Sequence, residues 1–164
     1  MRTQFFRSHE SFEDQYLRSA CERLSSAQTI EEDEALKYTD RMGRNILHYL
    51  GYYGHHAAYL KILTTPAYRH LGLETDREKL APASYWVPNA FDALREGSDV
   101  ALLTRHFPEI VLESWHVSPD EISIPSSCRK LLDHFMEEPE YEMWHDHAMS
   151  LLSCIKPTRT FPGQ

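Results

Sequence analysis

The sequence predicts an all-α fold made of stacked helical hairpins. Apolar residues recur at helical spacing along most of the chain, glycine or proline separates these segments, and no convincing strand alternation is present. Of the 164 residues, 41% are hydrophobic and 26% are charged, which is the composition of an ordinary folded domain. We therefore expect residues 1–164 to form a single helical domain.

Two helices are expected in the N-terminal part of the chain. The first covers residues 10–24, because its apolar positions recur every four residues, at Phe12, Tyr16, Ala20 and Leu24. The acidic run at 31–34 suits the positive N-terminal end of a short second helix that leads to Leu36 and Tyr38.

The next segment predicts a helical hairpin. Apolar stretches at 46–53 and 57–63 are separated by Gly54, and Pro66 closes the unit because a proline cannot continue a helix. We expect Gly54 to end the first helix in a left-handed conformation, which glycine adopts without steric cost. The residues expected in the core of this hairpin are Leu47, Leu50, Ala58, Ile62 and Leu63.

Polar residues and glycines around the hairpin have roles that follow from their chemistry. Asp40 and Gly43 suit a tight turn, and Asn45 can cap the following helix and hydrogen-bond the imidazole of His48. Gly51 has no side chain, so a neighbouring helix can approach it closely.

Helix pairs are also expected downstream. The first is a degenerate pair at 88–107, hinged at Gly97 and closed by Pro108, with its helical segments at 90–95 and 100–107. A short helix at 109–115 and a C-terminal helix pair at 126–155 complete the expected fold.

The segment Asp40, Gly43, Asn45, Ile46, Leu47, His48, Tyr49, Leu50, Gly51, Gly54 and His55 resembles the ankyrin repeat, in which two short helices are joined at a Gly-His. This resemblance is good over residues 40–63, in an ankyrin-like unit expected at 40–65, and it implies stacked hairpins with divergent capping helices. It also implies a structural role for His55 and partner contacts at the turn. A helical hairpin that converged on similar turn chemistry is the alternative.

The sequence also departs from the ankyrin pattern, and after His55 its apolar positions are shifted by about one residue. Ile46 replaces the family's proline, the expected Gly-Ala-Asp-Val-Asn return is absent at 64–68, and no clear second copy follows at the family's spacing. The nearest candidate for a second copy is the helix-Gly-helix around Gly97, which lies 43 positions after Gly54.

Composition limits the classes of function. A net charge of −8 and a pI near 5.6 argue against binding to nucleic-acid phosphates. Three cysteines signal neither a complete disulfide framework nor a four-thiolate zinc site, and no apolar run reaches the length of a membrane span. We expect no membrane association and no cofactor, and a cytosolic location unless a secretion system exports the chain.

Catalytic and metal-binding patterns are weak. His145, Asp146 and His147 form the densest group of potential ligands, but residues two apart on a helix point about 200° from each other, so the two histidines cannot easily share one ion. Cys128 lacks the signature of a nucleophilic cysteine and is expected to be a buried thiol. We therefore expect neither catalysis nor a metal site.

Aromatic residues are concentrated in and after the ankyrin-like segment, and Tyr and Trp are enriched at protein interfaces. We expect Tyr52 and Tyr49 to face a groove or solvent. Together with the turn, this predicts a partner-binding surface formed by Arg41, Met42, Arg44, Tyr49, Tyr52, Tyr53 and His56.

The sequence thus favours a protein-binding module without catalysis, with an immunity protein or inhibitor that blocks a toxin or other partner as the first hypothesis. A pathogen effector that binds a host protein, a structural subunit of a larger assembly and a metal-dependent enzyme using His145, Asp146 and His147 are the alternatives.

Overall fold

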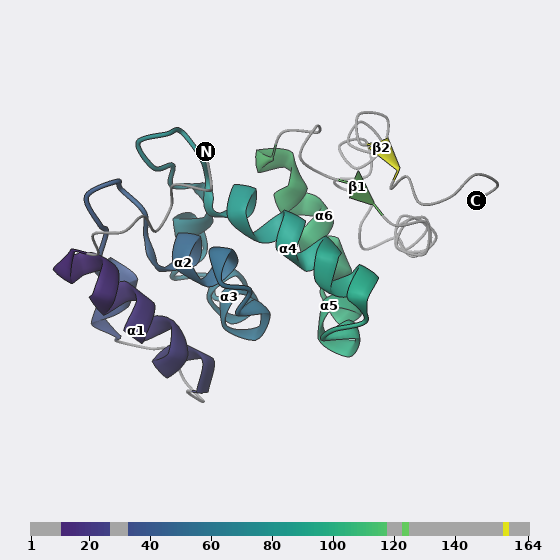
Figure 1. Cartoon of the computed structure of the whole chain (residues 1–164), viewed down its shortest axis with the longest axis horizontal. Coiled ribbons are helices and arrows are strands. Elements are labelled where there is room, and N and C mark those ends of the chain that lie inside the picture. Colours follow the sequence, from purple (N-terminus) through teal and green to yellow (C-terminus); the bar gives the residue numbers. More distant parts are fainter. Residues whose placement is uncertain (1–10, 27–32, 118–122, 125–155, 158–164) are drawn as a thin grey trace. The chain divides into compact units, whose positions relative to one another are not determined.

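The computed structural model describes residues 11–26, 33–117, 123–124 and 156–157 (Figure 1). Within these residues the chain is α-helical, as predicted, apart from β1 (Ser123–Ile124) and β2 (Lys156–Pro157), which pair in parallel. The chain divides into two compact units, Met1–Trp86 and Val87–Gln164. No described helix combines the length and the hydrophobicity that crossing a bilayer requires.

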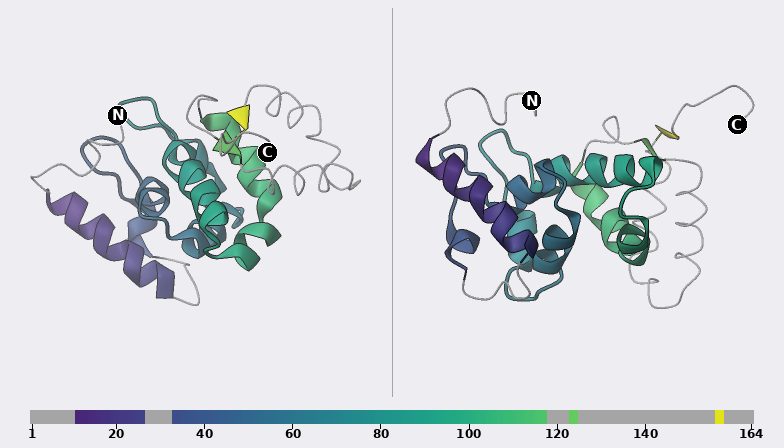
Figure 2. Two further views of the ribbon diagram at one scale, coloured as in Figure 1. Left: turned by 45° about the vertical axis from the view of Figure 1, so that its right-hand side comes forward. Right: turned by 60° about the horizontal axis from the view of Figure 1, so that its bottom comes forward.

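The described part of the first unit contains three α-helices, two short 3-10 helices and the start of a fourth α-helix. In chain order these are α1 (Phe12–Ser26), η2 (Glu34–Lys37), α2 (Ile46–Tyr52), α3 (His56–Leu63), η3 (Arg69–Leu73) and α4 (Pro82–Glu96). Helix α1 lies against both α2 and α3, which form an antiparallel hairpin (Figure 2). The predicted hairpin at 46–53 and 57–63 is therefore confirmed, and the short helix expected before Tyr38 is a 3-10 turn.

Helix α1 begins with a reciprocal cap. Ser11 N–H donates to the Asp14 carboxylate (3.1 Å), and Asp14 N–H donates to the Ser11 hydroxyl (3.2 Å), which satisfies two N–H groups that the helix leaves without partners. The expected apolar stripe is only partly right, because Phe12 is 73% exposed. A spacing of four residues drifts by about 40° per step around a helix of 3.6 residues per turn. The buried face instead consists of Leu17, Ala20, Cys21 and Leu24.

The α2–α3 hairpin has the predicted cap and hinge. The Asn45 side chain accepts hydrogen bonds from Leu47 N–H (2.9 Å) and His48 N–H (3.2 Å), so it caps α2. Gly54 has φ +74°, the left-handed conformation expected at the hinge. The five apolar residues predicted for the core of this hairpin are all buried.

A close contact between α2 and α4 organises the core of the first unit. A Cβ atom added at Gly51 would lie 2.8 Å from Trp86 Cβ and 3.1 Å from the Trp86 nitrogen, so only glycine allows this approach. The Trp86 ring is fully buried and stacks on Tyr59 at 4.2 Å between ring centroids. The role predicted for Gly51 is thus confirmed.

In the second unit, α4 continues to Glu96 and is followed by α5 (Val100–Arg105), α6 (Phe107–Glu113) and the 3-10 turn η4 (Ser114–His116). Gly97 separates α4 from α5 with φ +81°, as expected of a hinge. Phe91 contacts Phe107 edge to face, with ring centroids 6.1 Å apart. The helix pair expected at 126–155 lies outside the described residues.

The expected start of α4 at residue 90 is wrong. The helix begins at Pro82, where a proline is tolerated because N–H groups in the first turn have no helical partner, and it continues through Pro88. Tyr85, Trp86 and Phe91 are buried on either side of Pro88, and their burial favours the continuous helix over a break.

We predict that Gly51→Ala destabilises the protein. In a helix this substitution normally stabilises by about 1 kcal/mol, but the new Cβ would overlap Trp86, and overpacking costs typically about 1 to 3 kcal/mol. The contact is with the Trp86 backbone and Cβ, which cannot rotate away. Urea unfolding followed by tryptophan fluorescence should therefore show a net loss of unfolding free energy.

Ser19→Ala, at an exposed position of α1, is the matched control and should change the free energy of unfolding by less than about 0.5 kcal/mol. A Gly51→Ala protein as stable as the wild type would show that α2 and α4 are not in contact at this point.

Candidate interaction surface

A turn organised by a buried carboxylate precedes α2. Asp40 Oδ1 accepts hydrogen bonds from Met42 N–H and Arg44 N–H, both at 2.9 Å. Asp40 N–H donates to the Arg44 carbonyl (3.0 Å), and Gly43 has φ +75°. The Asp40 carboxylate therefore fixes the shape of the turn, which we call turn 1 and define as residues 40–44.

The same turn is built a second time before α4. Asp76 Oδ1 accepts from Glu78 N–H and Leu80 N–H, both at 2.9 Å, and Asp76 N–H donates to the Leu80 carbonyl (3.0 Å). Lys79 has φ +66° and occupies the position that Gly43 has in the first copy. This second turn, residues 76–80, is called turn 2, and it starts 36 positions after turn 1.

The two turns lie side by side. Arg77 N–H of turn 2 donates to the Met42 carbonyl of turn 1 at 2.8 Å. His48 Nε2 of α2 lies 2.9 Å from the Leu80 carbonyl of turn 2, and because a carbonyl can only accept, Nε2 carries the proton. Backbone and imidazole bonds thus hold turn 2 against both turn 1 and α2.

The tautomer of His48 fixes the rest of its bonding. With the proton on Nε2, Nδ1 accepts from Asn45 N–H at 3.0 Å and completes the capping box of α2. Burial lowers the pKa of His48 below its ordinary value, so the ring is neutral at pH 7. Asn45 and His48 are therefore hydrogen-bonded, but through the Asn45 backbone N–H, whereas we expected the Asn45 side chain to bond the imidazole.

A buried polar network joins turn 1 to α1. The Tyr49 hydroxyl lies 2.6 Å from Asp14 Oδ1 and 2.6 Å from Asp40 Oδ2, so its single proton is shared between two carboxylates. Arg44 Nε donates to Asp40 Oδ2 at 2.7 Å and supplies a positive charge next to this buried carboxylate. Tyr85 repeats the role of Tyr49 in the second copy, donating to Asp76 Oδ2 at 2.7 Å.

Three of the residues predicted to contact a partner are therefore internal. Arg44, Tyr49 and His56 are buried, and His56 Nδ1 accepts from Trp86 Nε1 at 3.0 Å. The expectation that Tyr49 faces a groove or solvent is wrong, because Tyr49 is fully buried and its hydroxyl lies between the carboxylates of Asp14 and Asp40. This excludes these three side chains from a contact surface in this conformation.

The other four predicted contact residues reach the surface. Arg41 and Tyr53 are exposed, whereas Met42 and Tyr52 are half-buried. Tyr52 and Tyr53 meet edge to face, with ring centroids 5.1 Å apart. The accessible part of the predicted surface is thus the tip of turn 1 and the C-terminal end of α2.

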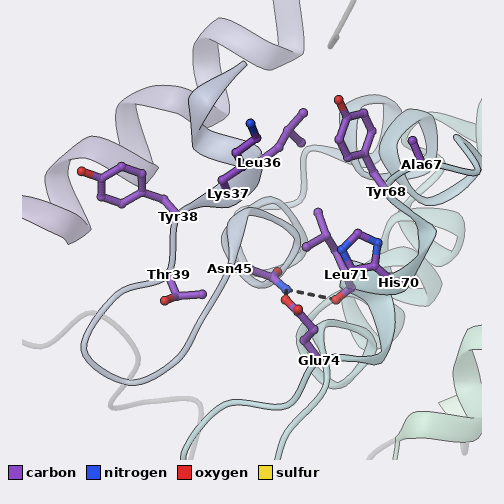
Figure 3. Close-up of a pocket in the computed structure, with 10 residues that line it drawn as sticks. All are labelled: Leu36, Lys37, Tyr38, Thr39, Asn45, Ala67, Tyr68, His70, Leu71 and Glu74. Atoms are coloured by element: carbon purple, nitrogen blue, oxygen red, sulfur yellow. Dashed lines mark hydrogen bonds between the residues drawn. The ribbon is translucent and has the colours of Figure 1, made fainter. Parts of the chain in front are cut away.

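A pocket of about 380 Å³ opens beside the two turns. Figure 3 shows residues 36–39 on one side and 67–74 on the other, with Asn45 between them. Asn45 Nδ2 donates to the Leu71 carbonyl (3.0 Å) and to Glu74 Oε1 (2.9 Å), which joins the cap of α2 to the 67–74 wall. The residues that line the pocket are Leu36, Lys37, Tyr38, Thr39, Asn45, Ala67, Tyr68, His70, Leu71 and Glu74.

Among the described residues, no group of three or more His, Cys, Asp or Glu side chains could hold a metal ion. Cys21 is buried, and burial raises the pKa of its thiol to about 12, so it is not a nucleophile at pH 7. Cys128 and the group at 145–147 lie outside the described residues.

Sequence reasoning missed turn 2. A signal was present, since Thr39, Asp40 and Arg41 are repeated as Thr75, Asp76 and Arg77. The copy was hidden because the left-handed position carries Lys79, and because Ala81 stands where turn 1 is followed by Asn45. The copy expected around Gly97 is therefore not the nearest one.

His55 has a structural contact, as the ankyrin resemblance implies. Its Nδ1 lies 2.8 Å from the Ser25 hydroxyl at the end of α1, so the residue connects the hinge to the first helix.

Comparison with protein-family models, curated proteins and solved structures finds no match for this chain.

We predict that Tyr49→Phe lowers stability. The substitution keeps the ring but removes the hydroxyl that contacts both Asp14 and Asp40, and loss of a partner to a buried polar group costs about 1 to 3 kcal/mol. Urea unfolding at pH 7 measures the change. Tyr53→Phe, on an exposed ring, is the control and should stay within about 0.5 kcal/mol of wild type. Equal stability of the two variants would contradict the network.

A pH dependence is expected from His48. Its pKa is lowered by burial in the folded state, so below about pH 6.5 the unfolded chain binds more protons than the folded chain. The contribution of His48 to the free energy of unfolding is therefore fully present above about pH 6.5, and it is lost as the pH falls. Urea unfolding between pH 7.5 and 5.5 should show this loss, and His48→Gln should show a smaller one.

The Gly51→Ala variant controls for low stability as such, since it removes no titratable group. An unchanged pH slope in His48→Gln would mean that this imidazole does not bind a proton more weakly in the folded protein.

Proposed function

We propose that this chain is a protein-binding module that uses turns 1 and 2 as its contact edge, and that its turn-helix units are ankyrin-like repeats. The observation that carries the proposal is the pair of like turns, joined by the hydrogen bond from Arg77 N–H to the Met42 carbonyl. Their tips expose Arg41, Arg77 and Lys79, whereas the carboxylates that shape them are buried. A rigid edge of this kind loses little conformational entropy on binding.

The polar interior also supports binding over chemistry in the described part of the chain. Asp40, Asp76 and His48 all make hydrogen bonds that hold turns or helix ends in place. The half-buried Tyr52 and Met42 add apolar area of the kind found at protein interfaces.

Inhibition of a toxin, the role placed first from the sequence, requires only such a surface. Binding of a host protein by an exported effector would use the same surface. The proposed activity in both cases is occupancy of a partner's functional site, which needs no group that performs a reaction.

Site-specific photocross-linking tests the proposal. A photoreactive amino acid at Met42, introduced into the chain in the cells that produce it, should cross-link to one protein in fixed stoichiometry, with products of the adjacent genes as the first candidates. The same amino acid at Ala101, exposed on α5, is the matched control and should not cross-link to that protein.

Cross-linking without selectivity between the two positions would contradict a contact edge at the turns. Absence of any co-purifying or cross-linked protein under these conditions would remove the binding function itself.

A further inference from the structure

Lys79 occupies a backbone conformation that costs free energy. Its φ of +66° lies in the left-handed region, which disfavours residues with a Cβ by roughly 1 to 2 kcal/mol. The equivalent position of turn 1 is Gly43, which meets the same requirement without strain. A lysine at a position that favours glycine suggests that its side chain is used.

Exposed basic side chains outnumber exposed acidic ones in the segment that contains the two turns. Between Glu34 and Trp86 the exposed acidic side chains are Glu34, Glu74 and Glu78, and they are outnumbered by the exposed basic ones, Lys37, Arg41, Arg69, Arg77 and Lys79. The full sequence carries a net charge of −8.

Two of these basic groups are available at turn 2. Arg41 has Glu13 of α1 as an electrostatic neighbour, but among the described residues no ion pair involves Arg77 or Lys79. Glu78 is the acidic residue between them. Turn 2 therefore presents two cations and one anion.

The adjacent pocket can hold one large apolar side chain. Its volume of about 380 Å³ exceeds the roughly 150 Å³ of a cavity that admits benzene. Apolar surface comes from Leu36, Ala67, Leu71 and the ring of Tyr68, while Lys37 and His70 add basic groups to the lining (Figure 3). Glu74, the acidic residue of the lining, is held by Asn45 Nδ2.

Resting on the proposed function, we infer that the partner contributes an acidic segment, which places one aromatic or large aliphatic side chain in the pocket and carboxylates near Arg77 and Lys79. The pocket wall leads into turn 2 along the chain, because Glu74 lines the pocket and Asp76 begins the turn two residues later. Apolar burial supplies affinity, and the charges select an acidic segment and speed its association.

Synthetic peptides test this inference. A short fluorescent peptide with a central Trp flanked by Glu and Asp should bind more tightly than the same peptide with Ala for Trp, or with Lys for the acidic residues. Its affinity should fall as salt rises, because exposed charges are screened. Equal binding of the three peptides, or no binding of any, would overturn the inference.

Variants separate binding from folding. Lys79→Gly removes the charge and fits the left-handed backbone, so it should weaken the acidic peptide while leaving the protein no less stable. Ala67→Trp fills the pocket from an exposed position, and Arg77→Ala removes the second cation. Ala67→Trp and the Arg77→Ala, Lys79→Gly double variant should each weaken binding by about tenfold, whereas Arg105→Ala, on exposed α5, should not.

The binding of peptides to these variants and the cross-linking experiment test different claims, so one can fail without the other. A partner cross-linked from Met42 whose capture is insensitive to Lys79→Gly and Ala67→Trp would preserve the proposed function and reject the acidic segment.

Discussion

The structure of the first unit depends on two buried carboxylates, Asp40 and Asp76. A buried carboxylate is tolerated only when hydrogen-bond donors replace the water it has lost. Each one finds them in two turn N–H groups and a tyrosine hydroxyl from the helix that follows. The turn and the first turns of the helix therefore form together, and the tip of each turn has a fixed direction.

Because the turn occurs twice, the second copy can form hydrogen bonds with the first copy and with α2. A second turn of the same shape places Arg77 N–H opposite the Met42 carbonyl and the Leu80 carbonyl opposite His48 Nε2. The close approach of α2 and α4 at Gly51 is compatible with these bonds because glycine leaves room for Trp86. Backbone bonding at the turns and side-chain packing between the helices thus favour the same arrangement.

Local conformations and helix caps were predicted from the sequence more accurately than the burial of individual side chains. The Gly54 hinge, the Asn45 cap and the role of Gly51 follow from conformational preferences of single residues, so they were predicted correctly. The burial of Tyr49 and His56 depends on partners 35 and 30 positions away, Asp14 and Trp86, which helical spacing cannot identify. Proline rules alone also placed the start of α4 too late.

The burial of side chains also changes which residues are candidates for the interaction surface. Aromatic enrichment pointed to Tyr49 and His56, but their polar atoms are committed to internal hydrogen bonds, and a side chain cannot serve both roles without breaking one of them. Lys79 is different, since its conformation costs free energy and no described ion pair repays that cost. A residue kept at such a cost is a stronger indication of function than an aromatic residue in a core, because packing already explains the aromatic one.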